Sequence, residues 1–123
     1  MNKKVLIAED EAHVARVLKM ILEKNEYQVH TVANGELAKQ QLEQEQPDVL
    51  ITDIQMPKMD GRALCEWIET ELPDRQFLIF VLTSRTEVEH REWTAGIKRL
   101  MFLEKPVSGR QLIAQLDSYF QQQ

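Results

Sequence analysis

The stretch Phe77-Leu78-Ile79-Phe80-Val81-Leu82 is apolar at every successive position. A strand with one wet face alternates apolar and polar residues, whereas an unbroken apolar run suits a parallel strand that is covered on both faces. The stretch therefore predicts a buried strand of a parallel sheet, and Thr83 follows at its end.

Four other segments have the short, apolar composition of strands: residues 5–8, 27–32, 49–52 and 100–103. Residues 27–32 alternate between apolar and polar, which indicates an edge strand. Longer stretches with helical spacing separate the strands, and the first carries an apolar stripe formed by Val14, Val17, Leu18, Ile21 and Leu22. The alternation predicts five β-α units.

The starts of the helices are predicted from capping residues. These are Asn34, Asp60 and Ser108 for the second, third and fifth helices, and either Ser84 with Glu87 or Thr86 with Glu89 for the fourth. The third helix is expected to end before Pro73, since proline cannot continue a helix.

The composition limits the class of protein. A chain of 123 residues with 43% hydrophobic content suits one domain, so residues 1–123 are expected to fold as a single unit. A formal net charge of −5 offers no basic patch for nucleic-acid phosphates. Cys65 is the single cysteine, which fits a reducing, cytoplasmic setting. Acidic residues from Glu9 onward interrupt the apolar run at residues 5–8, so neither an export signal nor a membrane span is expected.

Acidic residues follow two of the predicted strands. Glu9 and Asp10 come directly after residues 5–8, and Asp53 follows residues 49–52. Ligands of open parallel sheets bind at the carboxyl ends of the strands, so the three carboxylates are expected to converge if those strands are neighbours. Such a cluster is unfavourable unless a cation or a proton neutralises it, and all-oxygen ligands suit Mg²⁺.

A hydroxyl and an ammonium group are expected at the same edge of the sheet. Thr83 ends the fourth strand, and Lys105 follows the fifth. A site of this composition can hold a phosphoryl group on one carboxylate. The metal and Lys105 would offset the charge of the phosphoryl oxygens, and Thr83 would donate a hydrogen bond to one of them.

The chain resembles response-regulator receiver domains of two-component signalling along nearly its whole length. The matching motifs are Val-Leu-Ile-Ala-Glu-Asp-Glu at residues 5–11, Asn-Gly-Glu at 34–36, Asp-Val-Leu-Ile-Thr-Asp-Ile-Gln-Met-Pro at 48–57, Met-Asp-Gly at 59–61, Val-Leu-Thr-Ser at 81–84 and Phe-Leu-Glu-Lys-Pro at 102–106. The resemblance implies an α/β, flavodoxin-like, doubly wound (βα)5 fold with five parallel strands in the order 2-1-3-4-5.

The same resemblance implies the roles of the site residues. Asp53 would accept a phosphoryl group from the phosphohistidine of a sensor histidine kinase or a phosphotransfer protein, and Thr83 and Lys105 would bind that group. The implied Mg²⁺ ligands are Glu9, Asp10, Asp53 and the backbone carbonyl of Gln55.

A conformational switch is also implied. Thr83 would move toward the phosphoryl group, Phe102 would turn inward, and the Lys105–Pro106 peptide bond would be cis. The signal would reach the face formed by the fourth helix, fifth strand and fifth helix, where an effector binds or a homodimer forms. Such a protein is a signalling switch that catalyses only its own phosphorylation and dephosphorylation.

Some positions leave alternatives open. Ala95-Gly96 stands earlier than the Gly-Ala pair of the family, and residues 97–101 fill the gap before Phe102, so the fourth helix is expected to end early or to be reshaped. Phe102 itself suits a buried core position as well as a switching one. Gln55 and Arg85 occupy positions that influence the lifetime of the acyl phosphate in the family.

Two other functions share single features with this sequence. A receiver fold that has lost its chemistry would be a phosphorylation-independent interaction module, although the complete set of site residues argues against it. A phosphohydrolase with an aspartate nucleophile uses similar groups but carries a second Asp where this chain has Gln55. His13, His30 and His90 show no ligand spacing and are assigned to the surface or to packing.

Overall fold

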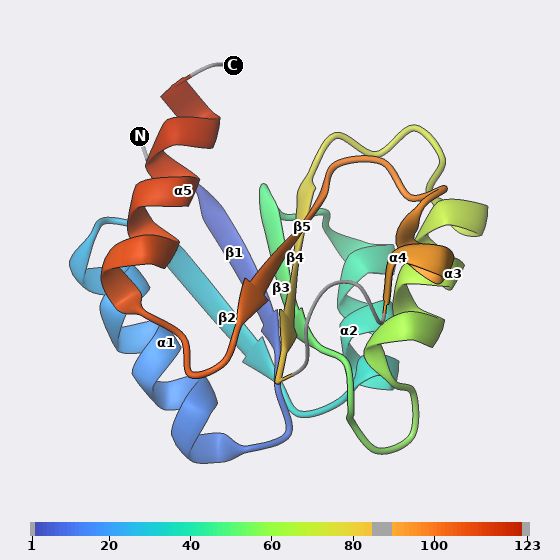
Figure 1. The fold of residues 1–123 in the computed structure, drawn as a ribbon, viewed down its shortest axis with the longest axis horizontal. Helices are drawn as coiled ribbons and strands as arrows, with labels where there is room; N and C mark the ends of the chain where they lie inside the picture. Colours follow the sequence, from blue (N-terminus) through green and yellow to red (C-terminus); the bar gives the residue numbers. More distant parts are fainter. Residues whose placement is uncertain (1, 85–89, 122–123) are drawn as a thin grey trace.

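The computed structural model describes residues 2–84 and 90–121. Across these residues, five parallel strands form one sheet in the order β2-β1-β3-β4-β5, which confirms the expected fold class (Figure 1). The strands are β1 (Lys4–Ala8), β2 (Gln28–Val32), β3 (Val49–Asp53), β4 (Leu78–Thr83) and β5 (Leu100–Glu104). The helices are α1 (Ala12–Lys24), α2 (Gly35–Gln44), α3 (Gly61–Glu71), α4 (Arg91–Thr94) and α5 (Gly109–Gln121).

Helices cover both faces of the sheet (Figure 1). α1 and α5 lie on one face, where Leu18, Leu22, Leu112 and Leu116 pack against the strands. α2 and α3 cover the opposite face with side chains that include Leu42 and form a second buried cluster. The sheet is therefore the middle layer of three, and its inner strands have no wet face.

Strand β4 contributes to both clusters. Leu78, Phe80 and Leu82 pack toward α1 and α5, whereas Ile79 and Val81 pack toward α2 and α3. All six residues of the strand are buried. This two-sided burial is the physical reason for the unbroken apolar run, and the prediction of a buried parallel strand is confirmed.

The predicted strand boundaries agree with the structure to within one residue, and β2 is an edge strand as expected. Three of the predicted caps are also present. Asn34 Oδ1 accepts a hydrogen bond from Leu37 N, Asp60 Oδ1 accepts one from Ala63 N, and Ser108 Oγ accepts one from Gln111 N. Among the residues that the structure describes, no helix combines the length and the apolar composition needed to cross a membrane.

The connection between β4 and β5 differs most from a regular β-α unit. Helix α4 ends at Thr94, and the carbonyl of Thr94 accepts a hydrogen bond from Ile97 N at 3.0 Å. Arg99 then takes a left-handed conformation with φ of 52° before β5 begins. These observations agree with the expected early end of the fourth helix. The suggested cap residues 86, 87 and 89, together with Arg85, lie outside the described residues.

A substitution of Phe80 tests whether the core around the sheet is packed as described. It is fully buried on β4, so Phe80→Ala is expected to lower the free energy of unfolding by about 3–5 kcal/mol through lost apolar burial and the cavity left behind. Met20→Ala is the control, because Met20 is 62% exposed and surface substitutions change stability by about 0.5 kcal/mol or less. Urea unfolding measures both variants, and equal losses would contradict the assigned core.

Candidate functional site

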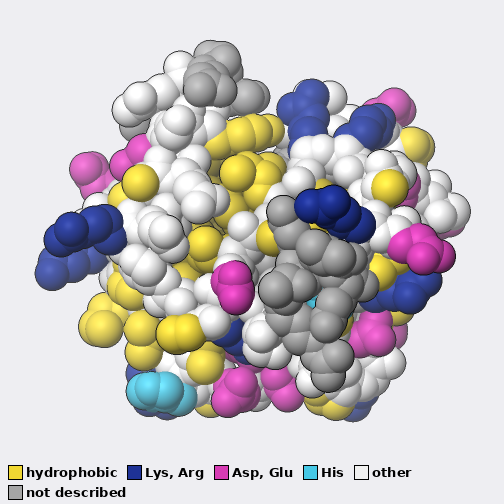
Figure 2. Space-filling view, in the orientation of Figure 1, with side chains coloured by type: hydrophobic (Ala, Val, Ile, Leu, Met, Phe, Trp, Pro, Cys, Tyr) yellow, Lys and Arg dark blue, Asp and Glu magenta, His cyan; other side chains and the backbone are white. Residues whose placement is uncertain are grey.

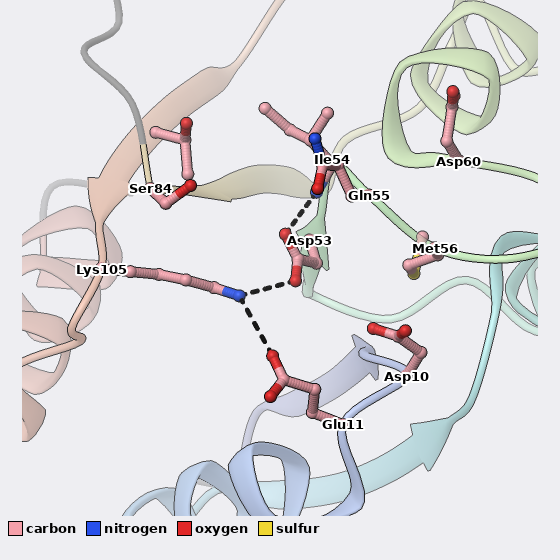
Figure 3. Close-up of a pocket in the computed structure, with 10 residues that line it drawn as sticks. Asp10, Glu11, Asp53, Ile54, Gln55, Met56, Asp60, Ser84 and Lys105 are labelled. Atoms are coloured by element: carbon pink, nitrogen blue, oxygen red, sulfur yellow. Dashed lines mark hydrogen bonds and ion pairs between the residues drawn. The ribbon is translucent and has the colours of Figure 1, made fainter.

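The parallel sheet brings the carboxyl ends of four strands to one edge. β1 and β3 pair with Ala8 opposite Thr52, so Glu9 and Asp10 leave the sheet beside Asp53. β3 pairs with β4, and β4 with β5. A cavity of about 720 Å³ opens at this edge (Figure 3). It is lined by Asp10, Glu11, Asp53, Ile54, Gln55, Met56, Asp60, Thr83, Ser84 and Lys105.

Three carboxylates meet at this edge. One oxygen from each of Glu9, Asp10 and Asp53 lies within 4.8 Å of the other two. Glu9 and Asp53 are buried, whereas Asp10 is exposed. The convergence expected from the sequence is therefore present, because β1 and β3 are neighbours in the sheet.

Glu9 experiences the least favourable environment of the three. Burial raises the pKa of Glu9 to about 7, and the nearby Asp53 charge acts in the same direction. A hydrogen bond from Glu11 N at 3.1 Å to Glu9 Oε2 and the charge of Lys105 oppose this rise. Glu9 Oε1 is buried and has no hydrogen-bond partner among the described residues. This oxygen lies beside two other carboxylates and has only a longer ion pair with Lys105, so it could serve as a ligand for a cation.

Lys105 supplies the positive charge of the site. Its Nζ lies 2.6 Å from Asp53 Oδ2 and 3.9 Å from Glu11 Oε1 (Figure 3). Glu9 Oε1 lies 3.7 Å from the same Nζ. Burial lowers the pKa of Lys105, but the hydrogen bond and charge of Asp53, with the charges of Glu9 and Glu11, raise it by more. Lys105 therefore stays an ammonium group that neutralises part of the carboxylate cluster.

The loop after β3 holds Asp53 through close backbone contacts. Ile54 N donates to Asp53 Oδ1 at 2.7 Å, and Gly61 N donates to the Ile54 carbonyl at 2.7 Å. A Cβ on Gly61 would lie 2.2 Å from the Asp53 carbonyl oxygen, so only glycine allows α3 to begin this close to the strand. Gly35 has the same relation to the Met59 carbonyl, which anchors the far side of the loop.

The other sequence-derived residues lie at the neighbouring strand ends. Thr83 is buried at the end of β4, and its carbonyl accepts a hydrogen bond from Lys105 N at 2.8 Å. The Lys105–Pro106 peptide bond is cis. Phe102 is partly buried and packs against the cluster under α2 and α3. Gln55 lines the cavity with an exposed side chain.

Some contributors were not assigned a role from the sequence. Glu11 forms an ion pair with Lys105. In the sequence, Glu11 was noted only as the last residue of the motif at residues 5–11. Ser84 lines the cavity directly after Thr83. His90, which was assigned to the surface or to packing, lies near Thr83. No spacing pattern could have found His90, because its contact depends on how the chain returns toward β4.

The comparison with protein families identifies the kind of domain to which this chain belongs. The model of the response regulator receiver domain matches residues 5–117. The chain belongs to this family. This membership favours the receiver interpretation over the phosphohydrolase.

Individual relatives agree with this receiver assignment. Alkaline phosphatase synthesis transcriptional regulatory protein PhoP of Bacillus subtilis is 31% identical over 116 residues, which cover 94% of this chain and 48% of PhoP. The chain thus spans about half the length of that relative.

Solved structures of receiver domains are also similar to this chain. The signal receiver domain of a signal transduction histidine kinase from Syntrophus aciditrophicus is 32% identical with a TM-score of 0.83, and the match covers 94% of this chain and 88% of that one. Chemotaxis response regulator CheY4 of Vibrio cholerae shares the fold with a TM-score of 0.87 at 24% identity, covering 96% and 98%.

The tight loop of this receiver domain can be tested at Gly61. Alanine is favoured over glycine within helices by about 1 kcal/mol, yet the Cβ of Gly61→Ala would contact backbone atoms that cannot rotate away. We expect the clash to dominate, with a net loss of about 1–3 kcal/mol in the free energy of unfolding. Gly96→Ala is the matched control, because its Cβ would meet nothing within 4 Å. A Gly61→Ala protein as stable as Gly96→Ala in thermal unfolding would argue against the close approach.

Proposed function

We propose that Asp53 is the phosphoacceptor of this receiver domain and takes its phosphoryl group from a phosphohistidine. The observation that carries the proposal is the contact of 2.6 Å between Lys105 Nζ and Asp53 Oδ2, beside two further carboxylates and at the wall of an open cavity. This arrangement pairs a nucleophilic carboxylate with the positive charge that a phosphoryl group requires.

The proposed transfer is a displacement at phosphorus. A carboxylate oxygen of Asp53 forms the new P–O bond while the P–N bond to the donor imidazole breaks, and the imidazole leaves with the electron pair of that bond. Lys105 offsets charge on the phosphoryl oxygens. The Thr83 hydroxyl donates a hydrogen bond to one of these oxygens. The position of Thr83 in the cavity wall supports this role.

The carboxylate cluster fits a divalent cation of the magnesium type. Glu9, Asp10 and Asp53 would supply carboxylate oxygens, and the Gln55 backbone carbonyl would supply another ligand. The buried Oε1 of Glu9, which accepts no hydrogen bond from the described residues, supports this assignment. When bound, Mg²⁺ would offset the negative charge of the phosphoryl oxygens. Burial is the main cause of the raised pKa of Glu9, and Mg²⁺ would also offset the Asp53 charge that adds to it.

The proposed partners are a sensor histidine kinase or phosphotransfer protein as donor and an effector as receiver of the signal. Output through α4, β5 and α5 is supported by apolar side chains gathered between α5 and β5 (Figure 2). Met101 on β5 is 36% exposed. Effector binding or homodimerisation at this surface would be the readout of the switch.

We further propose that residues 1–123 act as one cytoplasmic receiver domain that catalyses only its own phosphorylation and dephosphorylation. The two buried clusters share every inner strand, which supports a single cooperative unit. The net charge of −5 supports a role without direct nucleic-acid contact for this stretch of chain.

The phosphoacceptor role is tested by Asp53→Asn. Incubation with Mg²⁺ and acetyl phosphate should add one phosphoryl group to the wild type and none to the variant, because the amide is not a nucleophilic carboxylate. Intact-protein mass spectrometry measures the addition. Asp60→Asn is the matched control: Asp60 lines the same cavity, and asparagine can keep its cap on Ala63 N. Unchanged phosphorylation of Asp53→Asn would refute the assignment, and no mass gain in the wild type would favour a phosphorylation-independent module.

The metal site is tested through the pH dependence of Mg²⁺ binding. The folded pKa of Glu9, about 7, lies above its ordinary value of 4.5. Protonation of Glu9 therefore stabilises the metal-free fold at low pH, and this contribution is lost as the pH rises through about 7. Since Mg²⁺ needs the ionised carboxylate, we expect its affinity to be about tenfold weaker at pH 6 than at pH 8.

Isothermal titration calorimetry at the two pH values measures this difference. Glu9→Gln is the control, because a side chain without a titrating proton should bind Mg²⁺ more weakly and with a much flatter pH dependence. Equal Mg²⁺ affinity of the wild type at pH 6 and pH 8 would contradict the role of Glu9.

A further inference from the structure

His90 lies where the phosphate-binding edge meets the connection before β5. Its Nε2 is 3.4 Å from Thr83 Oγ1, and its ring stacks on Phe102 with 6.3 Å between centroids and 24° between planes. Trp93 Nε1 donates a hydrogen bond to His90 Nδ1 at 3.1 Å. One imidazole ring therefore contacts the threonine at the site, the aromatic residue of β5 and a tryptophan of α4.

The position of the His90 ring is fixed from two sides. Thr94 Oγ1 donates to the His90 carbonyl at 2.7 Å, which holds the backbone. Trp93 packs against the buried cluster under α2 and α3, and the Arg62 guanidinium lies 5.9 Å from its ring centroid. The indole N–H that contacts His90 is thus carried by an anchored side chain.

The hydrogen-bond partners determine which nitrogen of His90 carries the proton. An indole N–H can only donate, so His90 Nδ1 must accept and cannot bear a proton. The neutral ring then carries its proton on Nε2, which faces Thr83. Thr83 Oγ1 is therefore the acceptor in this contact, and the hydroxyl proton of Thr83 points elsewhere.

We propose that His90 is a positioning residue for phosphate recognition: its Nε2–H donates to Thr83 Oγ1 and so directs the Thr83 hydroxyl proton toward a phosphoryl oxygen on Asp53. The inference rests on the proposed function of Asp53 and Thr83. Phosphoryl oxygens only accept hydrogen bonds, so the hydroxyl of Thr83 must act as a donor to them. A hydrogen bond donated to the hydroxyl oxygen occupies one of its acceptor positions, so it favours orientations in which the Thr83 proton points away from His90 before the phosphoryl group arrives.

The same contacts connect the hydroxyl to the output side of the domain. A shift of Thr83 toward Asp53 changes its distance to His90, and His90 touches both Phe102 and Trp93. His90 is thus placed to transmit the position of one hydroxyl group to the packing of two aromatic side chains.

The test compares two substitutions of His90. His90→Phe keeps an aromatic ring against Phe102 but removes both hydrogen bonds. His90→Gln offers an amide oxygen to Trp93 Nε1 and an amide N–H to Thr83. Beryllofluoride, a phosphoryl mimic, is titrated in saturating Mg²⁺ and followed by NMR. We expect His90→Phe to weaken beryllofluoride binding by about three- to tenfold, the effect of one neutral hydrogen bond, and His90→Gln to restore it to within about twofold.

A double-mutant cycle separates positioning from a general structural effect. If His90 acts through Thr83, then His90→Phe should have no further effect in a Thr83→Ala background. Mg²⁺ affinity without beryllofluoride should be the same in the wild type and in all His90 variants. In addition, ¹⁵N chemical shifts of the wild-type imidazole should show the proton on Nε2 and a bare Nδ1.

The outcomes are distinct. Equal beryllofluoride affinity of His90→Phe and wild type, an undiminished effect of His90→Phe in the Thr83→Ala background, or a proton on Nδ1 would each overturn the positioning role while leaving Asp53 as acceptor. A wild-type protein that binds no beryllofluoride would overturn the proposed function, and this inference with it.

Discussion

A buried cluster of negative charge at one end of the sheet is the constraint on which the site depends. Glu9 and Asp53 are almost completely buried, and with Asp10 they bring three carboxylate oxygens within 4.8 Å of one another. Lys105 contributes one ammonium group to this cluster. One positive charge does not balance three negative ones. A proton on Glu9 would reduce the remaining negative charge, and a divalent cation would cancel it. The fold keeps this repulsion in place because the carboxylates are carried by β1 and β3, which pair along their length.

The carboxylate cluster stays accessible to ligands because close backbone contacts hold the neighbouring loop in place. Gly61 brings the start of α3 against the Asp53 carbonyl, and Gly35 brings the start of α2 against the Met59 carbonyl. These approaches fix the loop that follows Asp53, and Ile54, Gln55 and Met56 of this loop line the cavity. A rigidly held carboxylate in an open cavity suits the proposed transfer from a large donor, since Asp53 would need no rearrangement when the donor arrives.

Strand β4 joins the stability of the domain to its chemistry. The strand is buried on both faces up to Thr83, its last residue, whose side chain lies in the cavity wall. Beyond this point, His90 returns to contact Thr83, and Phe102 of the neighbouring strand stacks on the His90 ring. The rigid strand therefore ends where the connection to α4 and β5 begins, and a local change at Thr83 can influence packing without disturbing the core.

The strands, three of the helix caps and most residues of the site could be predicted from the order of residues alone. The apolar run at residues 77–82 could only be buried on two faces, and Glu9, Asp10, Asp53, Thr83 and Lys105 all stand at strand ends, which parallel pairing must gather at one edge. The displaced Ala95-Gly96 pair also indicated the early end of α4, whereas the ion pair of Glu11 with Lys105 and the contact of His90 with Thr83 emerge only in the folded chain. Those features depend on distances between segments that no local pattern encodes. Hydrophobic periodicity reports which face of an element is buried, but not which side chain it meets.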